Sequence, residues 1–271
     1  MQIQQANRQL AYIKLALQGP SGSGKTYSAL LLAHGLCNDW SKIVLIDTEN
    51  GSANLYAHLG PFNILTLDAP YSPERYMNAI ELALKSGEVI IIDSISQCWE
   101  FLKDFHSNLA GNSFTNWAKV NPRHKAFVDS ILLANAHVIC TMRTKQEYVL
   151  NQKDGKYVPE KVGLKAIQRD GIDYDFTLVF DIDHKHHCKA SKDRTGLFMD
   201  HPEYEAFLID KTTGERIISW IQQGDLKEQI LNCASVDKLN ELYRRYRPKS
   251  TDVVELFKYQ KHLLSTSLVS N

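Results

Sequence analysis

The residues best suited to chemistry lie together in one short segment, Gly19-Pro20-Ser21-Gly22-Ser23-Gly24-Lys25-Thr26. The segment matches G-x-x-x-x-G-K-[ST], a pattern in which glycines let successive backbone N–H groups turn inward around phosphate oxygens. Lys25 would reach the β- and γ-phosphates of a nucleoside triphosphate, and the Thr26 hydroxyl would bind Mg²⁺. We include the next residue, Tyr27, in the nucleotide-binding segment. The motif predicts a site for ATP and Mg²⁺.

Two acidic residues at the ends of predicted strands are candidates for the rest of this site. Residues 89–93, VIIID, form a continuous apolar run that ends in aspartate, as in a Walker B strand, so Asp93 is predicted to reach the Mg²⁺ shell. Residues 42–47, KIVLID, are also typical of a buried parallel strand, and Glu49 follows its carboxyl end, where open α/β sheets bind ligands. Glu49 is a candidate for polarising the attacking water. The pattern is equally typical of a carboxylate in a loop or helix cap.

The flanking sequence supplies the elements that must position these residues. An apolar segment at 11–17 precedes the glycine-rich motif, and residues 27–36 are apolar at helical spacing, which predicts strand, phosphate-binding loop and helix in succession. Further strands are expected at 62–67, 136–141 and 174–181, and helices at 72–85 and 95–134, the latter interrupted at 111–113 and 121–122. Residues 205–210 and 216–220 flank a Thr-Thr-Gly-Glu sequence, which predicts a closing hairpin.

Three segments leave alternatives open. Phe114 and Trp117 could stack nucleobases, or could fix their loop onto the core, which their spacing slightly favours. Residues 148–171, with Asp154-Gly155 as the expected hairpin turn, are a modestly basic excursion that either is solvated or contacts a phosphate backbone. The His184–Cys188 cluster has metal-binding residue types, but no second cluster stands at finger spacing, so a zinc site is not expected.

Composition limits the classes of function. Lys and Arg number 31, and Asp and Glu also number 31, so any nucleic-acid binding must come from local patches rather than overall charge. The five cysteines form no C-x-x-C pair, which indicates reduced thiols and a cytoplasmic location. We see neither a signal peptide nor an apolar stretch of membrane-spanning length, so no membrane partner is expected.

Three segments together resemble the RecA-like branch of P-loop ATPases: GPSGSGKT, the strand end Asp47-Thr48-Glu49, and VIIIDS. In that branch the strand after the P-loop helix carries the catalytic glutamate, so the resemblance implies this role for Glu49. The sequence Lys192-Asp193-Arg194-Thr195-Gly196 resembles the K-x-R-x-G hairpin that RecA-like recombinases and DnaB-type helicases insert into the neighbouring subunit's nucleotide site. The resemblance implies that Lys192 and Arg194 stabilise γ-phosphate charge in trans, and therefore that the protein is a homo-oligomer, a filament or a ring.

A closer resemblance, to the short phage-type RecA-like ATPases of single-strand annealing and recombination, is carried by FTNWAKVNPRH, HVICTMRTK, IQRDGIDYDF and SKDRTG. It covers roughly residues 10–222. The chain differs from full-length recombinases in lacking their N-terminal extension and an obvious glycine-rich DNA loop after Arg143. Thr141 or Arg143 falls where the family keeps a polar residue that senses the γ-phosphate.

We therefore expect a doubly wound, mainly parallel RecA-like α/β sheet flanked by helices, with an antiparallel hairpin edge. The ATPase core should span 1–223, and residues 224–271 should form a small helical tail that either docks a partner or is simply solvated. The expected function is Mg²⁺-dependent ATP hydrolysis coupled to single-stranded DNA in recombination or replication, with a single-strand-binding protein as a further partner. The alternatives are a nucleotide-gated assembly factor with little turnover and a DnaB-like helicase motor.

Overall fold

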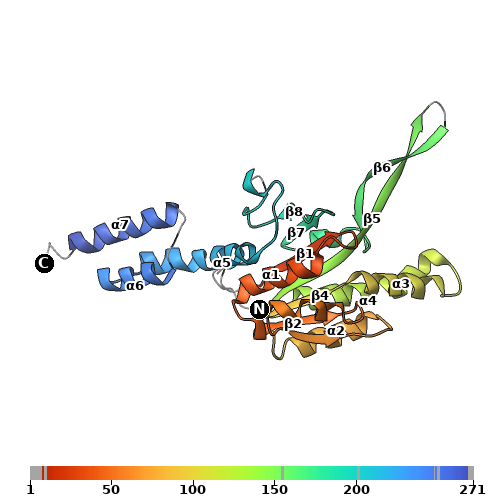
Figure 1. Cartoon of the computed structure of the whole chain (residues 1–271), viewed down its shortest axis with the longest axis horizontal. Coiled ribbons are helices and arrows are strands. Elements are labelled where there is room, and N and C mark those ends of the chain that lie inside the picture. Colours follow the sequence, from red (N-terminus) through yellow and green to blue (C-terminus); the bar gives the residue numbers. More distant parts are fainter. Residues whose placement is uncertain are drawn as a thin grey trace. The chain divides into compact units, whose positions relative to one another are not determined.

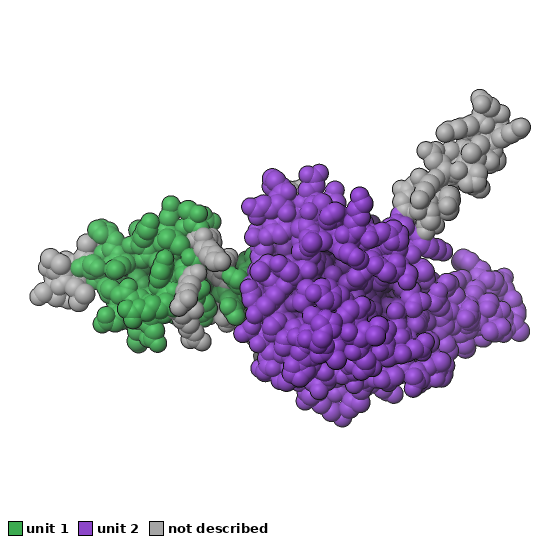
Figure 2. Space-filling model, in the orientation of Figure 1, with its two compact units in different colours: residues 1–11, 217–271 green, residues 12–216 purple. Residues whose placement is uncertain are grey.

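The computed structural model describes residues 8, 11–153, 156–199, 202–246, 248 and 251–267, and only the backbone of 146–163, 223–225, 245 and 266–267. The chain divides into two compact units, one of residues 12–216 and one of residues 1–11 with 217–271 (Figure 2). The division falls at Ile217, seven positions before the expected boundary at Gly224. The expected turn at Asp154-Gly155 lies outside the described residues, and residues 153 and 156 on either side of it are paired.

A mostly parallel sheet is the centre of the larger unit (Figure 1). Its strands are β1 (Lys14–Gly19), β2 (Ile43–Asp47), β3 (Asn63–Thr66), β4 (Val89–Asp93), β5 (His137–Lys153), β6 (Lys156–Ala166), β7 (Leu178–Ile182) and β8 (Cys188–Asp193). They follow the order β3-β2-β4-β5-β1-β7-β8, and β6 pairs with β5 alone. All neighbours in this order are parallel except β7 and β8. The expected antiparallel hairpin at the sheet edge is confirmed.

Helices cover both faces of this sheet, which explains why its central strands are apolar throughout. Alternate residues of β4, such as Ile90 and Ile92, pack in one core with α2 (Pro73–Ala83), α3 (Ser96–Ser107) and α4 (Ser113–Leu132). The intervening residues point to the opposite face, since side chains alternate along a strand. That face is in contact with α1 (Lys25–Cys37). A strand buried on both faces has no polar position until its end, so its first polar side chain is delivered to the sheet's edge.

Removing the Phe127 ring is expected to destabilise the larger unit strongly. Phe127 of α4 is fully buried, and its ring centroid lies 5.2 Å from that of Tyr76 in α2. Phe127→Ala should therefore lower the free energy of unfolding by about 3–5 kcal/mol, through lost burial and the cavity left behind. Chemical denaturation followed by circular dichroism measures this loss. Phe114→Ala on the same helix is the matched control and should cost almost nothing, because Phe114 is 85% exposed; equal losses would contradict the packing described here.

The expected closing hairpin at 205–220 is wrong. Residues 211–231 form one helix, α5 (Lys211–Leu231), whose first turn is capped by Asp210, with Oδ1 accepting from the Thr212 amide at 2.8 Å. Gly214 does not mark a turn: a Cβ there would lie 2.3 Å from the Leu32 carbonyl oxygen of α1. The glycine is needed because two helices approach closely. Of the expected first strand, only Phe207 pairs with the sheet, as a bridge to Cys188.

The expected helix interruption at Pro122 is also wrong. The break at Gly111 does separate α3 from α4, and Asn112 caps α4 by accepting a hydrogen bond from the Phe114 amide at 2.8 Å. Pro122, however, lies inside α4. Buried Val120 and Phe127 on either side of it pack into the core, and this packing keeps the helix continuous despite the missing amide donor.

The smaller unit contains a helical core of its own. The end of α5, α6 (Val236–Tyr246) and α7 (Thr251–Ser267) bury Leu226, Ile230 and Phe257 together. The helical tail is thus confirmed, although its first helical residues are the end of α5. Gly224 lies within α5 and does not interrupt it. None of the helices in the described part of the chain is long and apolar enough to cross a membrane.

Candidate active site

The glycine-rich loop connects β1 to α1, and one of its own amides, that of Ser23, donates to the Pro20 carbonyl oxygen at 3.3 Å. Gly22 and Gly24 have φ values of 77° and 85°, a left-handed conformation that favours glycine. In the described chain no side chain caps the start of α1 at Gly24, so the first amide groups of the helix have no side-chain acceptor. A Cβ on Gly19 would lie 2.5 Å from the Ile182 carbonyl of β7, which keeps the loop's first residue small. The loop therefore presents amide groups at a helix N-terminus that no side chain caps, which is the arrangement that binds phosphate.

Lys25 is held by the loop that it belongs to. Its Nζ donates to the carbonyl oxygens of Gly19 at 3.0 Å and Pro20 at 2.8 Å. Burial lowers the pKa of Lys25, while the negative charges of Asp93 and Glu49 oppose that shift. The hydrogen-bond acceptors of the ammonium group are neutral carbonyl oxygens, and a phosphate group would be a stronger partner than these.

Thr26 and Asp93 lie together at the ends of α1 and β4. The Thr26 hydroxyl donates to Asp93 Oδ2 at 2.6 Å, and the Thr141 hydroxyl of β5 donates to the other carboxylate oxygen. Burial raises the pKa of Asp93, and the hydrogen bonds from Thr141 and Thr26 act against that rise. Hydroxyl and carboxylate oxygens are the ligands that Mg²⁺ prefers, so these two side chains fit a magnesium ion shared with phosphate oxygens.

Glu49 is fixed at the end of β2 by contacts on two sides. Its amide donates to Asp47 Oδ1 at 2.6 Å, and its Oε1 accepts from Arg143 Nε at 3.0 Å and Nη2 at 2.7 Å. Arg143 comes from β5, which lies between β4 and β1 in the sheet. The carboxylate predicted to polarise water is thus paired with a guanidinium, and its second oxygen makes no hydrogen bond with the described residues.

Strand order explains why these distant residues meet. In the sheet, β2, β4, β5 and β1 are adjacent and parallel, so their carboxyl ends lie along one edge. Glu49 follows β2, Asp93 is the last residue of β4, Arg143 is the last residue of β5 that pairs with β1, and the phosphate-binding loop follows β1. The charges of Asp93, Glu49 and Arg143 all influence the pKa of Lys25, because the three groups lie near its ammonium group.

A buried hydroxyl in the loop supports the fit of a nucleotide here. Ser23 Oγ is one of five buried side-chain atoms of the described residues that have no hydrogen-bond partner. A buried polar atom without a partner is costly, and phosphate oxygens or their bound water would satisfy the Ser23 hydroxyl. The glycine-rich loop, the lysine and the Thr26–Asp93 pair match the needs of Mg²⁺ and ATP together.

His186 is a site residue that sequence reasoning missed, since it was considered only as part of a metal cluster. It lies in the turn between β7 and β8, and its Nδ1 is 3.0 Å from the Ser23 carbonyl oxygen. A Cβ on Gly24 would lie at the same distance from that nitrogen. The turn between β7 and β8 therefore contacts the phosphate-binding loop at Ser23 and Gly24. Nothing in the spacing of the sequence indicates this contact, because 163 positions separate the two residues.

Lys192 and Arg194 do not join the phosphate-binding residues of their own chain. Lys192 Nζ donates to the carbonyl oxygens of Asp173 at 2.8 Å and Tyr174 at 2.5 Å, and Arg194 Nη2 donates to Tyr174 at 3.0 Å. Burial lowers the pKa of Lys192, and nearby Arg194 adds to that effect. Both cations are held by backbone carbonyls, and neither forms an ion pair with a carboxylate of the described residues.

Comparison with models of protein families matches residues 11–206 to a family described as an AAA domain. The chain belongs to this family. The AAA domain includes every residue placed above around the phosphate-binding loop, and it identifies the protein as having a P-loop ATPase fold. A search of curated proteins finds no match.

Proposed function

We propose that this AAA-domain protein hydrolyses ATP with Mg²⁺ and couples hydrolysis to single-stranded DNA binding in recombination or replication. The observation that carries the proposal is that Lys25, Asp93 and Glu49 lie together at one edge of the sheet. Lys25 is the cation, Asp93 the metal ligand and Glu49 the base. Each of these three groups is required in hydrolysis by P-loop enzymes.

Each site residue has a distinct task in this proposal. The loop amides and Lys25 bind and orient the β- and γ-phosphates, and Thr26 with Asp93 would hold Mg²⁺, which neutralises phosphate charge. Glu49 accepts a proton from water as it attacks the γ-phosphorus, so its free oxygen must face that water. Arg143 positions this carboxylate and adds positive charge beside the γ-phosphate.

The Glu49–Arg143 pair also supports coupling to a ligand outside the nucleotide site. Both hydrogen bonds from the guanidinium go to the same oxygen, Glu49 Oε1, which leaves that oxygen little room to accept from a water molecule. Arg143 belongs to β5, and its backbone oxygen accepts from the Ile167 amide at 2.7 Å, just after β6. A ligand that shifts the β5–β6 base would therefore change how Glu49 is held. The same pair favours the second candidate function, a nucleotide-gated binder with little turnover in the absence of that ligand.

Phosphate release with and without single-stranded DNA tests the proposal. Turnover that requires Mg²⁺ and rises when DNA is added supports it. Measurable ATP binding with negligible turnover under both conditions would identify the nucleotide-gated binder instead. We also infer a cytoplasmic location, because all five cysteines are free thiols.

Assembly into a homo-oligomer follows from the role proposed for Lys192 and Arg194. Their contacts with Asp173 and Tyr174 carbonyls are weak enough to exchange for a phosphate of the neighbouring subunit, since an anion is a better partner for a cation than a neutral carbonyl. The resemblance to short phage-type annealing and recombination ATPases supports a filament or ring with shared nucleotide sites.

Arg194→Ala is expected to lower hydrolysis about 1,000-fold in the assembled protein only, the range of a lost arginine finger. Lys189→Ala is the matched control: Lys189 is an exposed cation of β8, which ends one residue before Arg194, and it lies outside the K-x-R pair. Turnover measured across protein concentration, alongside light scattering for assembly, separates assembled from dispersed protein. Normal turnover by assembled Arg194→Ala would refute the shared site.

A further inference from the structure

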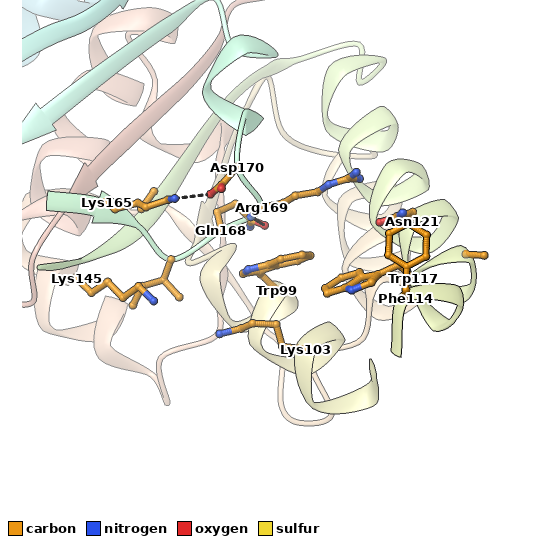
Figure 3. Close-up of a pocket in the computed structure, with 13 residues that line it drawn as sticks. Trp99, Lys103, Phe114, Trp117, Asn121, Lys145, Lys165, Gln168, Arg169 and Asp170 are labelled. Atoms are coloured by element: carbon orange, nitrogen blue, oxygen red, sulfur yellow. Dashed lines mark hydrogen bonds and ion pairs between the residues drawn. The ribbon is translucent and has the colours of Figure 1, made fainter. Parts of the chain in front are cut away.

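A groove of about 1030 Å³ lies between α3, α4 and the end of β6 with the part of β5 that pairs with it (Figure 3). It shares no lining residue with the phosphate-binding loop. Aromatic side chains of α3 and α4 form one wall, from Trp99, Phe114 and Trp117, whereas Lys145 of β5 and Lys165 of β6 lie on the facing side. The groove thus combines flat apolar rings with opposing cations.

The aromatic wall is arranged for stacking. The rings of Trp99 and Trp117 lie 5.9 Å apart at 25° to one another, and His106 stacks on Trp117 at 4.1 Å and 24°. Both tryptophans also pack partly against the core, which fixes their rings in place. Phe114, by contrast, is 85% exposed and lines the groove. An exposed phenylalanine beside a fixed stack offers a further ring face to a planar ligand.

Charge in the groove is predominantly positive. Lys103, Lys145, Lys165 and Arg169 line it, against the single lining carboxylate of Asp170, which is 2.9 Å from Lys165. Among the described side chains, Lys103 and Lys145 have no ion-pair partner. The whole chain has a formal net charge of zero, so this cluster is a local concentration of cations. Cations that stand beside aromatic rings match a ligand with alternating phosphates and bases.

We propose that this groove binds single-stranded DNA, with bases stacked on Phe114 and Trp99 and backbone phosphates on Lys103 and Lys145. The inference rests on the proposed function, since it gives the DNA a site. Duplex DNA keeps its bases stacked on one another, so it cannot use the aromatic wall and should bind less well.

Hydrogen bonds connect the groove to the nucleotide site. Gln168, which lines the groove, is buried and donates to the Ile95 carbonyl oxygen at 3.1 Å, two residues beyond Asp93. The Arg143 amide donates to Ser96 Oγ at 2.9 Å, at the start of the helix that carries Trp99 and Lys103. A strand of DNA in the groove therefore contacts elements that also position Asp93 and the Glu49–Arg143 pair, which gives stimulation of hydrolysis a physical route.

The test uses the full-length chain with Mg²⁺, an ATP analogue and fluorescein-labelled oligothymidylate, with anisotropy as the readout. Phe114→Leu keeps an apolar side chain but removes the ring, and should raise Kd about fivefold to 100-fold, whereas Phe114→Tyr keeps the ring and should preserve affinity. Lys103→Glu should raise Kd and reduce the slope of log K against log salt by about one. Leu133→Ala and Lys85→Glu are controls at exposed positions outside the groove and should bind as the natural chain does.

The outcomes separate the groove from the function. Suppose that the natural chain binds oligothymidylate and that Phe114→Leu and Lys103→Glu bind it as tightly. The groove is then not the DNA-binding site, while the DNA-coupled function stands. If the natural chain hydrolyses ATP but binds no oligothymidylate, both the groove and the DNA coupling fail. Equal affinity for oligothymidylate and for its duplex with oligoadenylate would overturn the stacking role.

Discussion

Glu49→Gln is expected to bind ATP as tightly as the natural chain and to hydrolyse it about 100-fold to 10,000-fold more slowly, the usual contribution of a general base. Glutamine has nearly the same shape, and its carbonyl oxygen can still accept from Arg143, so the neighbourhood of the pair should persist. What the amide cannot do is take a proton from the attacking water. The effect should therefore appear in kcat rather than in nucleotide affinity.

The chain offers a matched control for this substitution in a second arginine–glutamate pair. Glu74 of α2 accepts from Arg123 Nε and Nη2 at 2.8 Å each, and these hydrogen bonds lower the pKa of Glu74 to about 2. Glu74→Gln disturbs an ion pair of the same kind, away from the phosphate-binding loop, and should leave turnover unchanged. Single-turnover phosphate release and fluorescent-nucleotide titration on both variants make the comparison. Full turnover by Glu49→Gln would mean that another group activates the water.

Lys25→Ala is expected to reduce kcat/KM for ATP hydrolysis by at least about 100-fold, the scale seen when one preorganised transition-state donor is removed. The ammonium group is buried among the loop carbonyls, with Asp93 and Glu49 near enough to influence its pKa. Without it, the two carboxylates would face the triphosphate with less positive charge between them. Both nucleotide binding and turnover should fall, in contrast to Glu49→Gln.

Lys85→Ala is the control for this lysine, since Lys85 is exposed near the end of α2 and has no part in the site. Thermal unfolding of Lys25→Ala without nucleotide should show a transition close to that of the natural chain, because the hydrogen bonds lost are those to the Gly19 and Pro20 carbonyls of the loop. Isothermal titration with ATP and Mg²⁺ then measures the loss of affinity. Unchanged affinity and turnover would exclude the loop as the phosphate site.

Features that depend on neighbouring residues in the chain could be predicted from the sequence. The strand, loop and helix around Gly19–Thr26 are continuous, and their apolar periodicity indicates them directly. The uninterrupted apolar run that ends at Asp93 predicted a strand buried on both faces, and its burial is complete. A strand at 174–181 was expected from the residue pattern, and a hairpin at Lys192–Gly196 from the resemblance to the K-x-R-x-G motif; both correspond to the β7–β8 hairpin.

Glycine and proline were interpreted wrongly where a distant element decided their role. Gly214 is typical of a turn, yet it lies in a helix because α1 approaches it through Gly35. Pro122 is typical of a helix end, yet packing on either side keeps α4 continuous. In both cases tertiary contacts outweigh the local preference of one residue, and those contacts are not visible in the neighbouring sequence.

By itself, therefore, the sequence determined the phosphate-binding loop and the acidic residues at the strand ends, because these are short segments whose residue types indicate their chemistry. Only the tertiary structure decided which strand ends are neighbours. Insertion of β5 between β4 and β1 brings Thr141 to Asp93 and Arg143 to Glu49, and the turn after β7 brings His186 to Ser23. The physical reason is that strand order depends on how whole helices cover both faces of the sheet, a property of the packed core rather than of any single segment.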